Sequence, residues 1–211
     1  MGSEHPPTES FIPPHPTLTA LGKAAQECRG CDLYKNATQA VIGEGARDAR
    51  CFFVGEQPGD QEDLQGRPSV GPAGRVLDEA LEAAGIPRAE VFITNAVKHF
   101  KFEPRGKRRL HQKPTLKEVR ACRPWLEAEL RIVEPDGIVC LGATAAQGLL
   151  GSTFRLTREH GRFFDSPLAK WVTATLHPSA VLRMPDEAAR DAARAQLIDD
   201  LRHVADRLRA A

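Results

Sequence analysis

Short apolar runs alternate along the chain with longer stretches in which apolar residues recur at helical spacing. Strands that are buried on both faces are predicted by four continuous apolar runs, at 51–54, 91–94, 137–141 and 171–176. Helices are predicted where apolar residues recur every three or four positions, over 73–85, 115–133 and 186–209 and from residue 143. This alternation predicts a three-layer α/β/α fold around a central, mainly parallel, four-stranded sheet.

The N-terminal residues do not share this pattern. Residues 1–17 are polar and contain five prolines, which predicts a disordered arm, whereas residues 18–211 are expected to form a single domain. No apolar run approaches the roughly 20 residues that a membrane helix requires, and the N-terminus lacks the apolar core of a signal peptide. A cytoplasmic protein without membrane contact is therefore expected.

Polar residues follow three of the four predicted strands. The first strand leads into Gly55-Glu56-Gln57-Pro58-Gly59-Asp60, the second into Asn95, and the fourth into His177-Pro178-Ser179. Parallel strands place their carboxyl ends at one edge of the sheet, where α/β proteins bind ligands, so these segments are expected to meet. A surface turn, a helix cap and a structural histidine are the respective alternatives, because each is common for these residue types.

Positive charge is concentrated in one stretch of an otherwise balanced chain. The 211 residues include 29 Lys and Arg against 28 Asp and Glu, which gives a net charge of +1. Residues 98–120 alone contain nine positive and two negative side chains, a net charge of +7. A basic loop expected at 104–114 is typical of phosphate binding, although a solvated charge run is the alternative. Its candidate phosphate ligands are Lys107, Arg108 and Arg109.

The same loop contains His111, whose side chain titrates near neutral pH and can act as a base or a nucleophile. Cysteine supplies the other reactive groups, at positions 28, 31, 51, 122 and 140. An odd number of cysteines in a chain without an export signal is poor evidence for disulfides. A metal or cluster site is favoured instead, and it centres on Cys28-Arg29-Gly30-Cys31.

Taken in order, these motifs resemble those of the uracil-DNA glycosylase superfamily. They are GEQPGDQED at 55–63, SVGPAGR at 69–75, TNAVKH at 94–99, the basic loop, ACRPWL at 121–126, VCLGATAA at 139–146 and HPS at 177–179. The resemblance covers roughly residues 20–205 and, within the iron–sulfur branch, is to the UdgX type. Gln57 and the inserted loop 107–111 are the two features typical of that type.

The resemblance implies a uracil-DNA glycosylase-like fold and a defined reaction. The protein would excise uracil from DNA, mainly single-stranded, in DNA repair, and would then bond covalently to C1′ of the abasic sugar through His111. Such a protein would act once per molecule and would be a monomer. Two alternatives remain open: a conventional glycosylase that turns over, and a non-catalytic module that binds single-stranded DNA.

The resemblance also implies roles for individual residues. Glu56 would stabilise the developing cation or orient His111, His177 would donate a hydrogen bond to O2 of the departing uracil, and Asn95 would recognise the pyrimidine edge. Gln57 would belong to the catalytic group. The remaining substrate-binding residues would be Gly55, Asp60, Ser69 and Ser179. Position 69 departs from the family pattern, in which an aromatic residue stacks on the uracil, so weaker uracil binding is expected.

An iron–sulfur cluster is the cofactor that the resemblance implies. Relatives use four cysteines for a 4Fe-4S cluster, whereas here the matching positions are Cys28, Cys31, His99 and Cys122. Imidazole can replace thiolate on cluster iron. Cys140 is the alternative fourth ligand, although it lies in an apolar strand where a cysteine is usually buried. A zinc site is a second alternative, because three cysteines and one histidine also suit zinc.

Overall fold

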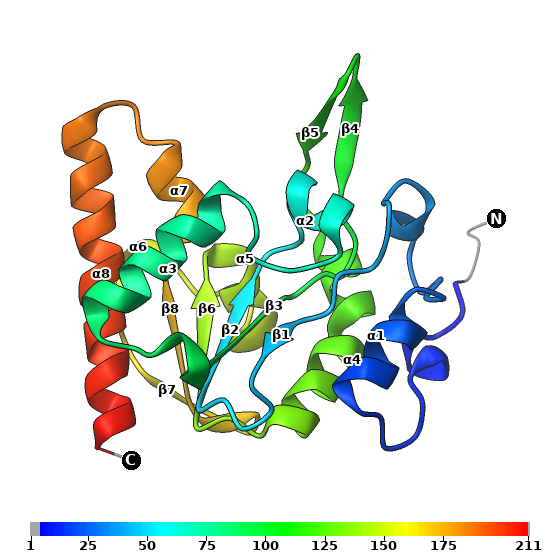
Figure 1. The fold of residues 1–211 in the computed structure, drawn as a ribbon, viewed down its shortest axis with the longest axis horizontal. Helices are drawn as coiled ribbons and strands as arrows, with labels where there is room; N and C mark the ends of the chain where they lie inside the picture. Colours follow the sequence, from blue (N-terminus) through cyan, green and yellow to red (C-terminus); the bar gives the residue numbers. More distant parts are fainter. Residues whose placement is uncertain (1–4, 211) are drawn as a thin grey trace.

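The computed structural model describes residues 5–210, which form a six-stranded sheet covered by helices on both faces (Figure 1). The four central strands are parallel and confirm the predicted strands: β2 (Cys51–Gly55), β3 (Val91–Asn95), β6 (Gly137–Leu141) and β8 (Ala169–Thr175). A short antiparallel strand lies at each edge, β1 (Glu44–Gly45) beside β3 and β7 (Phe164–Ser166) beside β8. These edge strands were missed by the four-strand prediction because two or three half-exposed residues leave no apolar run.

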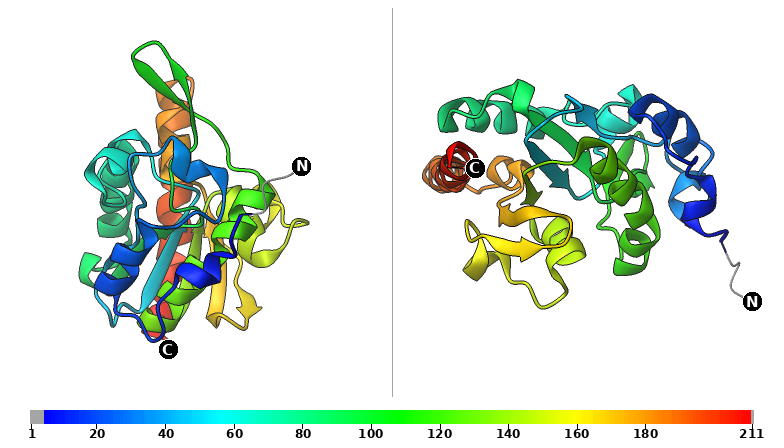
Figure 2. Two further views of the ribbon diagram at one scale, coloured as in Figure 1. Left: turned by 90° about the vertical axis from the view of Figure 1, so that its right-hand side faces the viewer. Right: turned by 90° about the horizontal axis from the view of Figure 1, so that it is seen from below.

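Two groups of helices cover the sheet, one on each face (Figures 1 and 2). One group packs on Phe52 and Val54 and comprises α1 (Leu18–Ala25), α4 (Leu116–Val133) and α5 (Ala143–Leu150). The other packs on Cys51 and Phe53 and comprises α3 (Pro72–Ala84), α7 (Pro178–Leu182) and α8 (Glu187–Arg209). Successive residues of a strand point to opposite faces, so both faces of β2 are buried as predicted.

Shorter helical segments connect these elements. They are η1 (Thr8–Phe11), η2 (Asp32–Lys35), α2 (Asp60–Gln65), η3 (Arg88–Glu90) and α6 (Leu156–Glu159). Within residues 5–210, none of the helices is both long enough and apolar enough to cross a membrane.

The N-terminal segment is packed against the domain, which differs from the predicted disordered arm. Thr8 in η1 is buried, and its hydroxyl donates a hydrogen bond of 2.6 Å to the carbonyl of Ala121 in α4. Thr17 caps the start of α1 by accepting a hydrogen bond from the backbone N–H of Ala20. Proline lowers the tendency to form regular helix but does not prevent packing. Residues 1–4 of the predicted arm lie outside the described residues.

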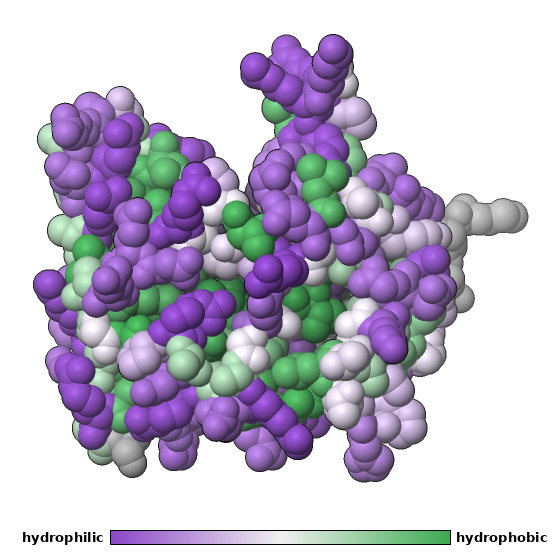
Figure 3. Space-filling view, viewed as in Figure 1, coloured by the Kyte–Doolittle hydropathy of each residue, from purple (hydrophilic) through white to green (hydrophobic). Residues whose placement is uncertain are grey.

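The predicted basic loop is a β-hairpin. β4 (Phe102–Arg105) pairs antiparallel with β5 (Arg108–His111), so that Phe102 lies opposite His111 and Arg105 opposite Arg108. Gly106 begins the two-residue turn with φ 59°, a backbone conformation that glycine adopts without strain. This hairpin, residues 102–111, projects from the body of the protein, and hydrophilic side chains gather at its tip (Figures 2 and 3).

Candidate active site

A cavity of about 640 Å³ opens at the carboxyl ends of the central strands. Gly55 and Asn95 line it from the ends of β2 and β3, and His177 lines it from the segment after β8. His111 reaches the same cavity from the end of the hairpin. The structure therefore confirms that the polar strand ends meet, and it adds the hairpin histidine to them.

Glu56 lies between His111 and Thr144 in this cavity. One carboxylate oxygen, Oε1, is 3.4 Å from Nε2 of His111, and the hydroxyl of Thr144 donates a hydrogen bond to the other, Oε2. Because Thr144 occupies Oε2, the carboxylate is oriented with Oε1 toward the histidine. Thr144 was not among the predicted site residues, although it follows the third predicted strand by three positions.

The side chain of Gln57 fastens the base of the hairpin. Its Nε2 donates hydrogen bonds of 3.1 Å to the backbone carbonyls of Lys101 and Gln112, and its Oε1 accepts one of 3.0 Å from the N–H of Lys101. Lys101 precedes β4 and Gln112 follows β5, so one buried amide holds both strands where they leave the domain. Gln57, which also lines the cavity, is thus fastened to the base of the hairpin that carries His111.

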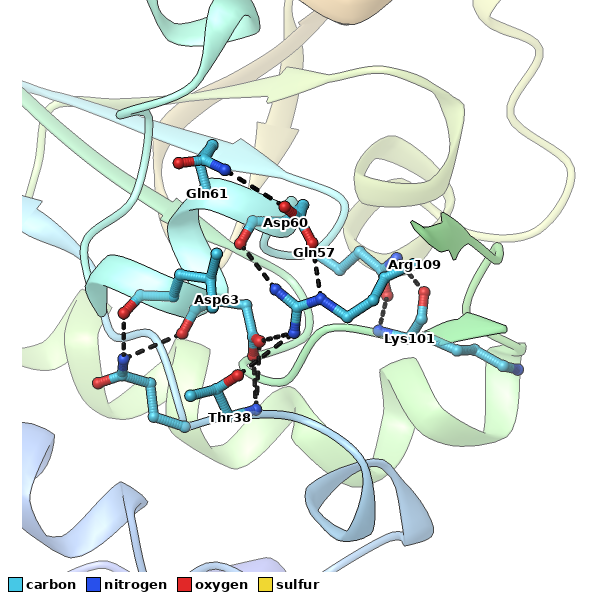
Figure 4. A network of polar contacts seen from close by, with 9 residues as sticks. Thr38, Gln57, Asp60, Gln61, Asp63, Lys101 and Arg109 are labelled. Atoms are coloured by element: carbon cyan, nitrogen blue, oxygen red, sulfur yellow. Dashed lines mark hydrogen bonds and ion pairs between the residues drawn. The ribbon is translucent and has the colours of Figure 1, made fainter. Parts of the chain in front are cut away.

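Arg109 holds the hairpin at a second point (Figure 4). Its guanidinium contacts Oδ1 of Asp60 at 2.6 Å and Oδ2 of the fully buried Asp63 at 2.5 Å, both on α2. It also lies over the rings of Phe100 and Phe102, at 5.4 and 5.0 Å from the ring centroids. Arg109 therefore anchors the hairpin to α2, and Asp60 is paired with it at the cavity wall, while contact of Arg109 with DNA stays a prediction.

Lys107 and Arg108 differ from Arg109 because both are exposed at the hairpin tip. Side chains successive along a strand point to opposite sides, which explains why Arg108 faces solvent while Arg109 faces α2. The tip can therefore contact a phosphate backbone without disturbing the anchor.

His111 is held largely neutral at pH 7 by its surroundings. Partial burial lowers the pKa of His111 below its ordinary value of 6.5, Glu56 opposes that shift, and the nearby guanidinium of Arg183 adds to it. A neutral imidazole retains a lone pair on one ring nitrogen, which a nucleophile requires. Arg183 also lines the cavity, and sequence analysis missed it because no motif marked it.

His177 is a neutral hydrogen-bond donor. Its Nδ1 accepts a hydrogen bond of 3.1 Å from the backbone N–H of Ser179 and lies 2.7 Å from the Ser179 hydroxyl. Burial lowers the pKa of His177 to about 4, with further contributions from Arg183 and His111. The proton of the neutral ring is therefore on Nε2, which remains free to donate. Ser179 therefore orients the ring of His177, and it also lines the cavity.

Asn95 is packed directly against Gly55. Asn95 is only 7% exposed, and a Cβ at position 55 would lie 2.3 Å from its Oδ1. Any side chain at position 55 would therefore displace the amide of Asn95. An amide held at a cavity wall offers one acceptor and two donors for the edge of a planar ligand.

The sequence model of the family described as the uracil DNA glycosylase superfamily matches residues 42–202 of this chain. The chain belongs to the uracil-DNA glycosylase superfamily. A Type-4 uracil-DNA glycosylase of Thermotoga maritima is 42% identical over 167 residues, which cover 79% of this chain and 83% of the relative. A Type-4 uracil-DNA glycosylase of Archaeoglobus fulgidus is 38% identical over 178 residues, covering 80% and 85% of the two chains.

In this member of the uracil-DNA glycosylase superfamily, Ser69 lies at the wall of the cavity in an unusual conformation. Its φ of 61° falls in the left-handed region, which non-glycine residues seldom adopt. The carboxylate of Glu62 accepts a hydrogen bond of 2.8 Å from the N–H of Ser69 and another from the N–H of Gly59. Burial raises the pKa of Glu62, although these two donors oppose the shift. Glu62, which was not predicted, joins the two loops of the wall.

Of the predicted cluster ligands of this glycosylase-superfamily member, Cys122 lies in α4 and Cys28 contacts that helix. The N–H of Lys98 donates a hydrogen bond of 3.2 Å to Sγ of Cys122, and the indole N–H of Trp125 donates one of 3.3 Å to Sγ of Cys28. Burial is the largest effect on Cys31 and Cys122, raising the pKa of both thiols, the latter to about 12, with smaller contributions from neighbouring cysteines. Hydrogen-bond donors directed at sulfur suit thiolates that ligate a cluster.

Two observations separate the candidate ligands. Burial lowers the pKa of His99 to about 4, so its imidazole is neutral, as ligation requires. Cys140 is fully buried inside β6, paired between Val54 and Ala174. Among residues 5–210, no three histidine, cysteine, aspartate or glutamate side chains are gathered closely enough to ligate one metal ion.

Proposed function

We propose that the protein excises uracil from DNA and then bonds covalently to the abasic sugar through His111. The observation that carries this proposal is the placement of His111 beside Glu56, on a hairpin fastened to the domain by Gln57 and Arg109. A histidine needed only for DNA contact would not require two anchors or a neighbouring carboxylate. The relatives are Type-4 uracil-DNA glycosylases, and membership of their superfamily supports the first step.

The first step is the heterolytic cleavage of the bond between N1 of uracil and C1′. The electron pair leaves with uracil, and the resulting anion carries part of its negative charge on O2. C1′ becomes cationic. The neutral His177 would donate from Nε2 to O2, and the carboxylate of Glu56 would stabilise the cation. Asn95 would pair with the pyrimidine edge. The base must leave the helical stack to enter the cavity, which costs least in single-stranded DNA.

In the second step a neutral ring nitrogen of His111 attacks C1′ and forms a carbon–nitrogen bond. The imidazolium then loses its remaining N–H proton to solvent, which leaves a neutral and poor leaving group on the sugar. A nucleophile held in place has a far higher effective concentration than water, so His111 would capture the cation first. Lys107 and Arg108 would bind flanking phosphates.

Incubation with a uracil-containing single-stranded oligonucleotide tests the proposal. We expect a protein–DNA product that survives boiling in detergent and carries one oligonucleotide per protein molecule. Free abasic DNA with repeated turnover would instead identify a conventional glycosylase. Binding without loss of uracil would identify a non-catalytic module.

The rate of adduct formation is expected to depend on pH through His111. Because burial and Arg183 lower the pKa of His111, the rate should stay constant from pH 8 to about 6.5 and fall below that as the ring becomes protonated. The midpoint of the fall should therefore lie below 6.5, the ordinary pKa of histidine. Single-turnover rates measured across this range give the midpoint, and a midpoint above 6.5 would contradict a neutral nucleophile.

We also propose that Cys28, Cys31, His99 and Cys122 hold a 4Fe-4S cluster with a structural role. The N–H groups directed at two of the sulfurs support a thiolate-ligated group. The ligands of a cluster bind separate iron atoms, whereas the four ligands of one zinc ion must converge on a single point. Bound, the cluster would tie the N-terminal segment to α4 and the segment after β3.

Metal analysis of the purified protein distinguishes these alternatives. We expect four irons per chain and visible absorbance near 400 nm, both lost on His99→Ala and both retained on Cys140→Ser. The Cys140→Ser variant is the matched control because that thiol is enclosed by the sheet. One zinc per chain, or loss of iron with Cys140→Ser alone, would contradict the proposed ligand set.

A further inference from the structure

Two oppositely charged side chains are buried together beneath the cavity. The side chains of Lys98 and Glu129 are 1% and 0% exposed, and Nζ of Lys98 lies 2.6 Å from Oε2 of Glu129. The ammonium also donates to the hydroxyl of Thr94 at 2.6 Å and to the backbone carbonyl of Asn95 at 2.7 Å. An ammonium has three donors, so each donor of Lys98 has a partner. A buried charge requires such complete pairing, which fixes the group in one place.

Lys98 contacts both Asn95, the candidate uracil-binding residue, and Cys122, a predicted cluster ligand. Its side chain binds the carbonyl of Asn95, the residue whose amide lines the cavity. Its own backbone N–H binds Sγ of Cys122. Only Ala96 and Val97 separate Asn95 from Lys98, and the lysine side chain folds back so that its ammonium contacts the end of the strand that precedes it.

One face of α4 supplies the partners that hold Lys98. Cys122, Trp125 and Glu129 are separated by three and four positions, which places them on one side of the helix. The carboxylate of Glu129 also accepts hydrogen bonds from the hydroxyl of Thr94 and from the N–H of Gly43 at 2.6 Å. The helix that carries a cluster ligand therefore also fixes the ammonium beneath Asn95.

We propose that Lys98 is a positioning residue for uracil recognition, which orients Asn95 through its backbone carbonyl and is itself anchored by Glu129. This inference rests on the proposed role of Asn95 in binding uracil. An amide discriminates between bases only if its donor and acceptor are aimed correctly, so a small rotation of the Asn95 backbone weakens recognition.

A double variant removes the ammonium without leaving a buried charge. In Lys98→Met with Glu129→Gln, the glutamine can still accept from Gly43 and the methionine fills the space of the lysine stem. The matched control is Arg123→Met with Glu127→Gln, which removes an exposed ion pair from the same helix. Uracil release is counted as the sum of adduct and free abasic sites, so the measurement does not depend on covalent trapping.

We expect free uracil to inhibit the Lys98 double variant about tenfold more weakly than the unaltered protein, with affinity for uracil-free single-stranded DNA unchanged. The control pair should leave both quantities unchanged. Unaltered inhibition by uracil, together with a lower unfolding temperature, would show a purely structural role and overturn the inference. If the double variant does not fold, Lys98→Arg keeps the charge but not the donor geometry, and the same loss of uracil inhibition is expected. An unaltered protein that neither releases nor binds uracil would refute the proposed function, and this inference with it.

Discussion

The His111→Ser variant should form no detergent-stable adduct with uracil-containing DNA. The imidazole of His111 is the nucleophilic group that the hairpin brings to the cavity beside Glu56. A serine side chain is shorter, and its hydroxyl is far less nucleophilic at neutral pH. In the proposed mechanism, cleavage of the glycosidic bond depends on Glu56 and His177, so uracil release should continue. The variant should therefore leave free abasic sites, which denaturing gels detect after alkali treatment.

Lys113 provides the control for this experiment, because it also lines the cavity and lies two positions from His111. Lys113→Met should alter DNA affinity and leave the adduct intact. A detergent-stable adduct formed by His111→Ser would show that another residue is the nucleophile. Loss of both uracil release and adduct would show that His111 acts in bond cleavage rather than in capture.

Removing the Arg109 anchor should slow adduct formation by about 100-fold while uracil release persists. The guanidinium joins the hairpin to two carboxylates of α2, those of Asp60 and Asp63, so its loss would allow His111 to move away from C1′. Displacement of a reacting group by about 1 Å has an effect of this size. The variant is best made as Arg109→Met with Asp63→Asn, since a buried carboxylate without its partner would destabilise the domain.

Arg108→Met is the matched control, because Arg108 is adjacent in the hairpin but exposed. It should lower DNA affinity, more strongly at low salt, and leave the rate at saturating DNA unchanged. Equal effects of the two variants on affinity and rate would contradict the anchor. Thermal unfolding of both variants identifies any general loss of stability.

The positions of Glu56, Asn95 and His177 could be predicted because strand ends follow a simple rule. Each stands at or within two residues of the end of a buried strand, and parallel strands bring those ends together. The central strands and the long helices could be predicted for a similar reason, since each gives a characteristic pattern of apolar residues along the sequence. The positions of residues that depend on such local patterns can be predicted without knowing which distant parts of the chain are in contact.

The hairpin and its anchors could not be predicted in this way. Between residues 102 and 111 the chain is mostly polar, so the alternation of a strand is hidden, and only the turn glycine marks it. Arg109 and Asp63 are separated by 46 positions, and as isolated sequence positions both are typical of solvated surface charges. Their burial follows from pairing with each other, which is a property of the assembled fold. The same holds for Lys98 and Glu129.

Glu56 and Gln57 are neighbours in the chain, yet one faces the cavity and the other the base of the hairpin. The residue at 57 can therefore change without altering the loop that presents the carboxylate. Under the proposed function, an insertion that forms the hairpin and one substitution to glutamine would suffice to turn an enzyme that releases its product into one that retains it. An insertion without the glutamine would be held to α2 through Arg109 alone. The proposed retention of the product would therefore require two small evolutionary steps.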